Sequence, residues 1–381
     1  MGRSRSGNRK QTVNPAPATS VRPWRRYAVV AAAALIVAAL VIARVANTGD
    51  DDGTPAARTS AGVTGGCEDA RTFAACLEQA KAGDAQAQLR LAEAYDGGEG
   101  VPEDDAAAAE WYRRAAEQGL AEAQFQLGTL YDSGRGLSRD AAQAVHWYRQ
   151  AADQGLALAQ HNLALMYLQG NGGLTRDTVE AVRWFRQAAE HGVALAQYNL
   201  GVAYETGEGV SKDDAEAVRW YRKAADAGLA TAQYKLGALH ATGTGVAKDA
   251  AEAVRWYRLA ATQGHVDAQN DLGLMYDTGE GVVEDDAEAV RWFRRAAAGG
   301  NTSAQYNLGL MYANGEGVRS DDARAYLWLS VAAATGADGI DRAPLEKVVG
   351  GLSPAARAAA DRLADTCRET AFKDCGEPTD P

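Results

Sequence analysis

The sequence predicts an all-α protein, a right-handed α/α solenoid of about seven repeats, with a transmembrane helix near its N-terminus. Three observations support this fold class: tryptophans recur at a fixed interval, apolar residues recur three and four positions apart within each interval, and glycines separate the apolar segments. A solenoid has such a period because each unit buries its apolar face only against its neighbours.

Seven of the eight tryptophans form one series, with spacings of 36, 37, 36, 36, 36 and 36 residues. The series consists of Trp111, Trp147, Trp184, Trp220, Trp256, Trp292 and Trp328. Trp24 lies outside it. The one longer step coincides with an extra residue in a turn, at residues 170–173.

Each unit begins with a predicted helix, helix A, that has the pattern A-x-A-Q-x-x-L-G-x-x-Y. Most copies have a glycine at the centre, such as Gly201, although glycine costs a helix up to about 1 kcal/mol. We therefore expect another helix backbone to pass close to that position. A G-x-G turn follows, such as the one from Gly207 to Gly209, because glycine adopts the positive φ that ends a helix and reverses the chain.

A second predicted helix, helix B, begins at an aspartate seven positions before each tryptophan. An aspartate at this position caps the helix by accepting a bond from a free backbone N–H group. The seven caps are Asp104, Asp140, Asp177, Asp213, Asp249, Asp285 and Asp321. Helix B continues as A-V-x-W-Y-R-x-A-A and ends at a glycine, and its paired aromatic residues are expected to form the core between repeats.

The N-terminal region carries a membrane signal. Residues 28–43 are sixteen apolar residues in a row, extended by Tyr27, and a membrane span needs roughly 17–25. Seven basic residues precede this segment, so the positive-inside rule places the N-terminus in the cytoplasm and the rest of the chain across the membrane. A signal peptide cleaved after Ala43 is the alternative.

These features divide the chain into six segments. They are a basic cytoplasmic tail (1–26), a transmembrane signal anchor (27–45), a flexible linker (46–66), an N-terminal capping helix (67–84), seven repeats (85–336), and a C-terminal capping helix with a tail (337–381). In the last segment Ser353 and Pro354 predict the start of a helix, because serine caps helices and proline is favoured at their first position.

The four cysteines lie outside the repeats, at Cys67, Cys76, Cys367 and Cys375. If this part of the chain is exported, two local disulfides are the natural expectation, Cys67–Cys76 and Cys367–Cys375. The other two connectivities would require the solenoid to close on itself.

Over residues 85–336 the pattern resembles the Sel1-like repeat, a relative of the tetratricopeptide repeat with a longer loop. The resemblance implies a superhelix in which helix A lines the concave side, and a function in holding protein partners together. Many bacterial members of the family are exported. We therefore expect a single-pass protein of the bacterial inner membrane, with its N-terminus in the cytoplasm and its repeats in the periplasm.

The resemblance also directs attention to the variable positions of helix A, because related solenoids use asparagine and lysine there to hold an extended peptide. The candidates stand one or two positions after the constant glutamine. They are Phe125, Gln126, Asn162, Tyr198, Asn199, Tyr234, Lys235, Asp271, Tyr306 and Asn307. Alternatively, these residues are family consensus and make local hydrogen bonds.

The sequence contains no G-x-x-x-x-G-K-[ST], H-E-x-x-H, G-x-S-x-G or S-x-x-K motif, so we expect no catalytic, cofactor-binding or metal-binding residues. The five scattered histidines are interpreted as variation among repeats. Beyond residue 44 the chain has 50 acidic and 31 basic residues, which argues against binding to nucleic acid.

The expected function is that of a membrane-anchored scaffold that binds a protein or peptide. One alternative is a protein that binds or hydrolyses cell-wall peptides or β-lactams, as cysteine-rich Sel1-like proteins are associated with. Those proteins carry cysteine pairs within their repeats, and this chain has none there. A purely structural or oligomerising spacer is the other alternative.

Overall fold

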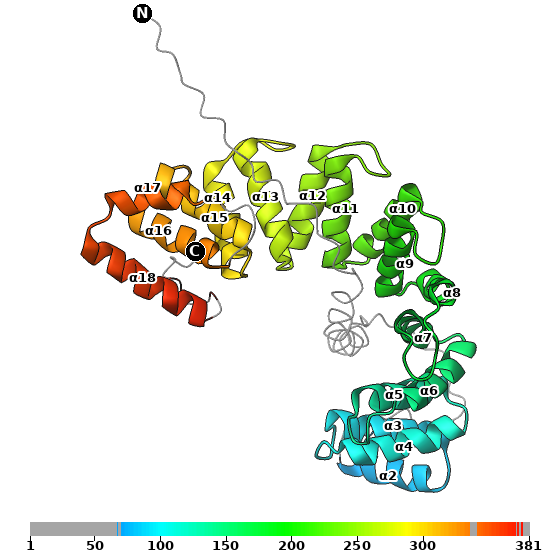
Figure 1. The fold of residues 1–381 in the computed structure, drawn as a ribbon. Coiled ribbons are helices and arrows are strands. Elements are labelled where there is room, and N and C mark those ends of the chain that lie inside the picture. The colour runs from blue at the N-terminus through cyan, green and yellow to red at the C-terminus, as the bar shows by residue number, and fades with distance from the viewer. Residues whose placement is uncertain (1–66, 68–69, 336–340, 371, 373–374, 376–381) are drawn as a thin grey trace, which may run out of the picture. The chain divides into compact units, whose positions relative to one another are not determined.

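The computed structural model describes residues 67, 70–335, 341–370, 372 and 375. These residues form seventeen helices, joined by turns and without a strand (Figure 1). The helices are α2 (Ala70–Lys81), α3 (Ala85–Gly97), α4 (Asp105–Glu117), α5 (Ala121–Ser133), α6 (Ala141–Asp153), α7 (Ala157–Gln169), α8 (Thr178–Glu190), α9 (Ala194–Thr206), α10 (Asp214–Asp226), α11 (Ala230–Thr242), α12 (Ala250–Thr262), α13 (Val266–Thr278), α14 (Asp286–Ala298), α15 (Thr302–Asn314), α16 (Asp322–Ala334), α17 (Ala343–Gly351) and α18 (Pro354–Glu369).

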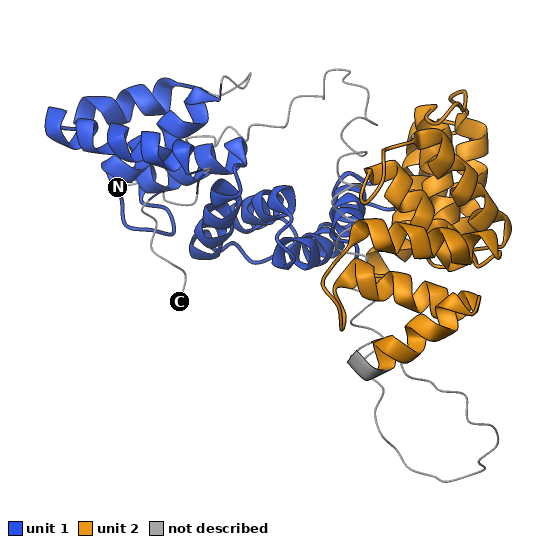
Figure 2. Cartoon of the chain, turned by 90° about the horizontal axis from the view of Figure 1, so that it is seen from below, with its two compact units in different colours: residues 1–40, 228–381 blue, residues 41–227 orange. Residues whose placement is uncertain are grey.

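The odd-numbered helices α3–α15 are helix A of the seven repeats, and the even-numbered helices α4–α16 are helix B. The chain divides into two compact units (Figure 2). Among the described helices, the unit within residues 41–227 contains α2 and repeats 1–4. The unit within residues 228–381 contains repeats 5–7 and helices α17 and α18. Inside each unit, every helix from α2 to α16 packs against the next one along the chain.

The predicted helix boundaries are confirmed. All seven aspartates cap helix B, and Asp213, for example, accepts a bond from the backbone N–H of Glu216. Each such cap stabilises the helix by about 1 kcal/mol. Helix A ends in every repeat at a left-handed glycine, such as Gly207 with a φ of 76°.

The glycine at the centre of helix A has a different role from the one expected. The nearest group is an aromatic ring in repeats 2, 4, 5 and 6 and the side chain of Leu329 in repeat 7, not a passing helix backbone. A Cβ atom on Gly201 would lie 2.7 Å from Cδ1 of Tyr221, and one on Gly237 would lie 2.7 Å from Cδ1 of Tyr257. The residue that follows the tryptophan therefore packs onto helix A of its own repeat, and at Gly128, Gly201, Gly237 and Gly273 a methyl group would meet the ring at under 3 Å.

The second glycine of the G-x-G turn connects neighbouring repeats. A Cβ atom on Gly209 would lie 2.2 Å from the carbonyl oxygen of Thr178, at the start of helix B in the preceding repeat. The same close approach occurs at Gly136, Gly172, Gly281 and Gly317. This turn therefore needs glycine for packing as well as for its positive φ.

Two hydrogen bonds also recur between repeats within each unit. The constant glutamine donates to the carbonyl eight residues earlier, at the end of the preceding helix B; the Gln197–Ala189 bond is 3.1 Å long. The arginine after the aromatic pair donates to a tyrosine eighteen residues later, and Arg186 Nη2 lies 2.9 Å from the Tyr204 hydroxyl. Equivalent bonds join Arg149 to Tyr167 and Arg258 to Tyr276.

The aromatic pair of helix B lies in the core, as predicted. The side chains of Tyr112, Tyr148, Phe185, Tyr221, Tyr257 and Phe293 are buried. Five of the seven tryptophans are buried too, while Trp111 and Trp147 are half-buried. A large aromatic side chain in every repeat compensates for a core that is otherwise mostly alanine.

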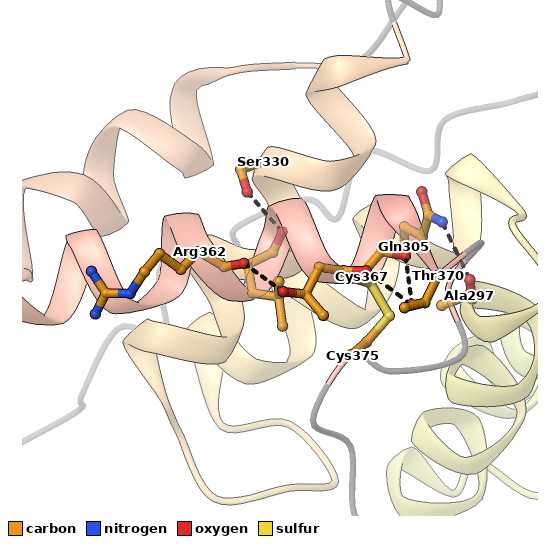
Figure 3. Close-up of a disulfide and its surroundings, with 9 residues drawn as sticks. Ala297, Gln305, Ser330, Arg362, Cys367, Thr370 and Cys375 are labelled. Carbon is orange, nitrogen blue, oxygen red and sulfur yellow. Dashed lines mark hydrogen bonds between the residues drawn. A yellow bond between two sulfur atoms is a disulfide. The ribbon is translucent and has the colours of Figure 1, made fainter.

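Both ends of the described chain carry a capping helix. At the N-terminal end α2 packs on α3, and Cys67 and Cys76 are joined by a disulfide with a Cα–Cα distance of 6.0 Å. At the other end α18 packs on α16, and Ser353 caps α18 as predicted. Figure 3 shows the second disulfide, Cys367–Cys375, which ties α18 to the chain that follows it.

Helix α17 was not predicted from the sequence. It is nine residues long, ends in two glycines, and buries one side chain, that of Val348. Packing against α16 therefore accounts for this helix better than its own sequence does.

No helix in the described part of the chain is long and apolar enough to cross a membrane. The predicted cytoplasmic tail (1–26), transmembrane segment (27–45) and linker (46–66) all lie outside the described residues.

Candidate functional site

The candidate partner-binding residues lie on helix A of repeats 2–7, within α5, α7, α9, α11, α13 and α15. They follow a glutamine whose side chain is buried in every one of these repeats and, in repeats 2, 3, 4, 6 and 7, donates to the preceding helix B. The glutamine orients helix A, so within each unit these residues occupy equivalent positions in successive repeats. We refer to their surface as the helix A face.

Burial separates the ten candidates into two groups. Asn162, Tyr198, Asn199 and Tyr306 are buried, so they offer little surface to a partner. The others are partly exposed: Phe125, Gln126, Tyr234, Lys235, Asp271 and Asn307. The second group is the part of the helix A face that a partner can reach.

The position directly after the glutamine has a packing role. The ring of Tyr198 lies 5.5 Å from that of Tyr221, and the ring of Tyr234 lies 5.7 Å from that of Tyr257. In each case the partner is the ring that covers the helix A glycine. Aromatic side chains at this position therefore extend the core of the repeat to the edge of the helix A face.

In repeats 3 and 4 the helix A face contains a buried hydrogen-bond network. His161 Nδ1 lies 3.2 Å from Asn162 Oδ1, and Asn199 Nδ2 lies 3.2 Å from His161 Nε2. Both contacts fit a neutral histidine with its proton on Nδ1, which donates to Asn162 and accepts from Asn199. Burial lowers the pKa of His161 to about 4, which favours this neutral form.

The sequence interpretation did not single out His161 as a hydrogen-bonding residue, because it treated all five histidines as variation among repeats. One signal was present. His161 stands at the aromatic position and is followed by asparagine, and the next repeat has asparagine at the equivalent position. A polar ring at an apolar position needs partners, and these two asparagines supply them.

In repeats 5 and 6 the helix A face carries charged side chains instead. The ring of Tyr234 stacks on that of His265, with 4.6 Å between the ring centres. Asn270 Nδ2 donates to Asp271 Oδ1 over 3.0 Å, and the Tyr234 hydroxyl also hydrogen-bonds to Asp271. Burial raises the pKa of Asp271 to about 6, because the carboxylate is partly withdrawn from water.

Within the described residues, no three His, Cys, Asp or Glu side chains are grouped so that they could hold a metal ion. What the helix A face presents is a row of donors, acceptors and charges at one repeating position.

Comparison with known proteins identifies the repeat. The family described as "Sel1 repeat" matches seven consecutive segments, at residues 85–120, 121–156, 157–193, 194–229, 230–265, 266–301 and 302–336. No curated protein gives a significant match.

Two solved structures illustrate the likeness. A Sel1 repeat protein from Oxalobacter formigenes is 35% identical, with a TM-score of 0.58 over 70% of this chain and 77% of that one. A protective antigen of uropathogenic Escherichia coli, described as displaying an SLR fold, is 25% identical, with a TM-score of 0.48 over 82% of this chain and 91% of that one. With seven matched repeats that cover most of its length, the chain belongs to the Sel1 repeat family.

Proposed function

We propose that this protein is a non-catalytic scaffold that binds a protein or peptide partner along the helix A face. In the same proposal, residues 27–45 anchor the chain in the bacterial inner membrane and place the repeats in the periplasm. The apolar run at residues 28–43 and the basic residues before it support the anchor and its orientation.

One observation carries the binding proposal. The position two after the constant glutamine is occupied by Gln126, Lys235, Asp271 and Asn307 in repeats 2, 5, 6 and 7, and all four side chains are partly exposed. The leucine that follows each of them is fully buried. A constant frame that presents a different polar group in each repeat is how repeat proteins recognise extended partners.

Site-specific photo-crosslinking in native membranes tests this proposal. A photoreactive residue replaces Lys235 or Asn307 in the full-length chain, and the matched control replaces Leu259, which is 41% exposed on α12, a helix B. We expect one discrete crosslinked product from positions 235 and 307 and none from position 259. Crosslinking only from position 259 would show that partners use a different surface.

Protease treatment of spheroplasts tests the membrane part. We expect added protease to degrade the repeats while an epitope tag on residue 1 stays protected inside the cell. Protection of the repeats in intact spheroplasts would contradict the orientation.

A further inference from the structure

Repeat 6 departs from the other repeats at the helix A face. Repeats 2, 4, 5 and 7 have an aromatic residue directly after the glutamine, followed by a neutral amide or a lysine. Repeat 6 has Asn270 and Asp271 at these two positions. An amide therefore replaces a ring, and a carboxylate replaces an amide or an amine.

The hydrogen bonding of Asn270 leaves one atom without a partner. Its Nδ2 donates to Asp271 Oδ1, and this bond fixes which end of the amide faces the carboxylate. The other end, Oδ1, is buried and accepts no hydrogen bond. The side chain as a whole is only 6% exposed. An unpaired buried acceptor is unfavourable, and this one lies beneath the surface, so the partly exposed carboxylate of Asp271 is the group of the pair that a donor from a partner can reach.

The groups around Asp271 also include no cation that could pair with its carboxylate. The side chains that influence its ionisation are Asn270, Tyr234 and Asp267, and none of them is cationic. Asp267 lies one helical turn earlier and is exposed, and it accepts a bond of 2.9 Å from Asn301 Nδ2. The cluster thus contains two carboxylates and an unpaired amide oxygen, and its donors are the amide of Asn270, the amide of Asn301 and the hydroxyl of Tyr234.

We propose that Asn270, Asp271 and Asp267 form a seat for a basic side chain, arginine or lysine, of the bound partner. A guanidinium or ammonium group supplies donors and positive charge together, and hydrogen bonds between charged groups are about twice as strong as neutral ones. The excess of acidic residues in the chain, with a net charge of −11, also favours the approach of a basic partner. This inference rests on the proposed function, because it names the chemistry of the partner at one repeat of the helix A face.

Peptide binding to the purified full-length chain tests the inference. The probes are blocked nonapeptides of alanine and serine whose central residue is arginine, lysine or citrulline, and citrulline has the shape of arginine without its charge. Calorimetry should show the arginine peptide binding about tenfold more tightly than the citrulline peptide, which corresponds to one charge-assisted contact. The lysine peptide should also bind more tightly than the citrulline peptide.

Two variants test whether the preference for the arginine peptide depends on Asp271. Asp271→Asn should abolish the preference for arginine over citrulline, while the matched charge change Asp277→Asn, on the same helix, should preserve it. Both variants should retain the helical circular dichroism of the parent. Equal binding of the arginine and citrulline peptides, or a preference that survives in Asp271→Asn, would overturn the inference.

The two proposals fail separately. Crosslinking from positions 235 and 307 would still support the helix A face as the binding surface if the charge preference were absent. Crosslinking only from position 259 would show that the helix A face is not the binding surface, and the proposed function would fail at that point.

Discussion

Helix A of repeats 3 and 4 and helix A of repeats 5 and 6 use the same backbone position in opposite ways. In the first pair, Asn162 and Asn199 are buried and bonded to the His161 ring. In the second pair, Lys235 and Asp271 are charged and partly exposed. The helices are equally long and end in the same kind of glycine cap, so the difference comes from side chains alone.

The comparison shows that the side chains of the helix A face differ between the two regions. In repeats 3 and 4 its polar groups satisfy one another and join two neighbouring repeats. In repeats 5 and 6 its charged side chains, Lys235 and Asp271, are partly exposed. The same position therefore makes internal hydrogen bonds in one region and, under the proposed function, contacts a partner in the other.

The largest effect is expected from exchanging residues between the two regions. Asn199→Lys places an ammonium group where the native side chain is 9% exposed, and an unpaired buried charge costs about 3–5 kcal/mol. Lys235→Asn, at a partly exposed position, should change the free energy of unfolding by only about 0.5 kcal/mol. Urea unfolding measures both values. Similar costs for the two variants would mean that the regions do not differ in the way described.

The next effect is a pH dependence of opposite sign in the two regions. The pKa of His161 is lowered from 6.5 to about 4, so its contribution to stability is complete above pH 6.5 and is lost as the pH falls towards 4. The pKa of Asp271 is raised from 3.8 to about 6, so its ionisation destabilises the fold as the pH rises from 4 to 6. Raising the pH through this window should stabilise repeats 3 and 4 by up to about 3 kcal/mol and destabilise repeat 6 by about 1–2 kcal/mol.

Native-state hydrogen exchange, followed for α7 and α13 separately, can resolve these two trends. Asp271→Asn serves as the control for repeat 6, because it should abolish the destabilisation there and leave repeats 3 and 4 unchanged. Parallel pH trends in α7 and α13 would contradict the opposite titration of the two groups.

The smallest effect tests the helix A glycine, which repeats 4, 5 and 6 share. Gly201→Ala and Gly237→Ala each place a methyl group 2.7 Å from a tyrosine ring, and overpacking of this kind costs about 1–3 kcal/mol. The gain in helix propensity offsets up to about 1 kcal/mol of that cost. We expect the two variants to shift the urea midpoint by equal amounts, and unequal shifts would reveal a difference in packing between the regions.

The sequence predicted the seven repeats and the helix caps because both depend on local patterns. Asp213 caps helix B through its own backbone neighbours, and Ser353 does the same for α18. The burial of Asn199 could not be predicted in this way. Its position lies at the edge of the buried stripe, and its surroundings depend on His161, a residue 38 positions earlier.

The ring beneath the helix A glycine shows a similar limit. Periodicity indicated that something must approach Gly201 closely, but it could not distinguish a backbone from the ring of Tyr221. Periodicity could not predict the bond from Arg186 to Tyr204 either, because the two residues belong to different repeats. Contacts between residues far apart in the sequence depend on how the helices pack, and sequence periodicity alone does not give that packing.

The contacts between repeats also bear on how such a chain changes in length. The same bonds recur within each unit, a glutamine to the eighth residue before it and an arginine to a tyrosine eighteen residues after it. A duplicated segment of 36 residues inserted inside either unit would therefore bring both halves of each bond with it. In-frame duplication or loss of whole repeats would change the number of helix A positions while leaving the caps and their disulfides untouched. Under the proposed function, a lineage would then change its contacts with a partner through copy number before any point substitution.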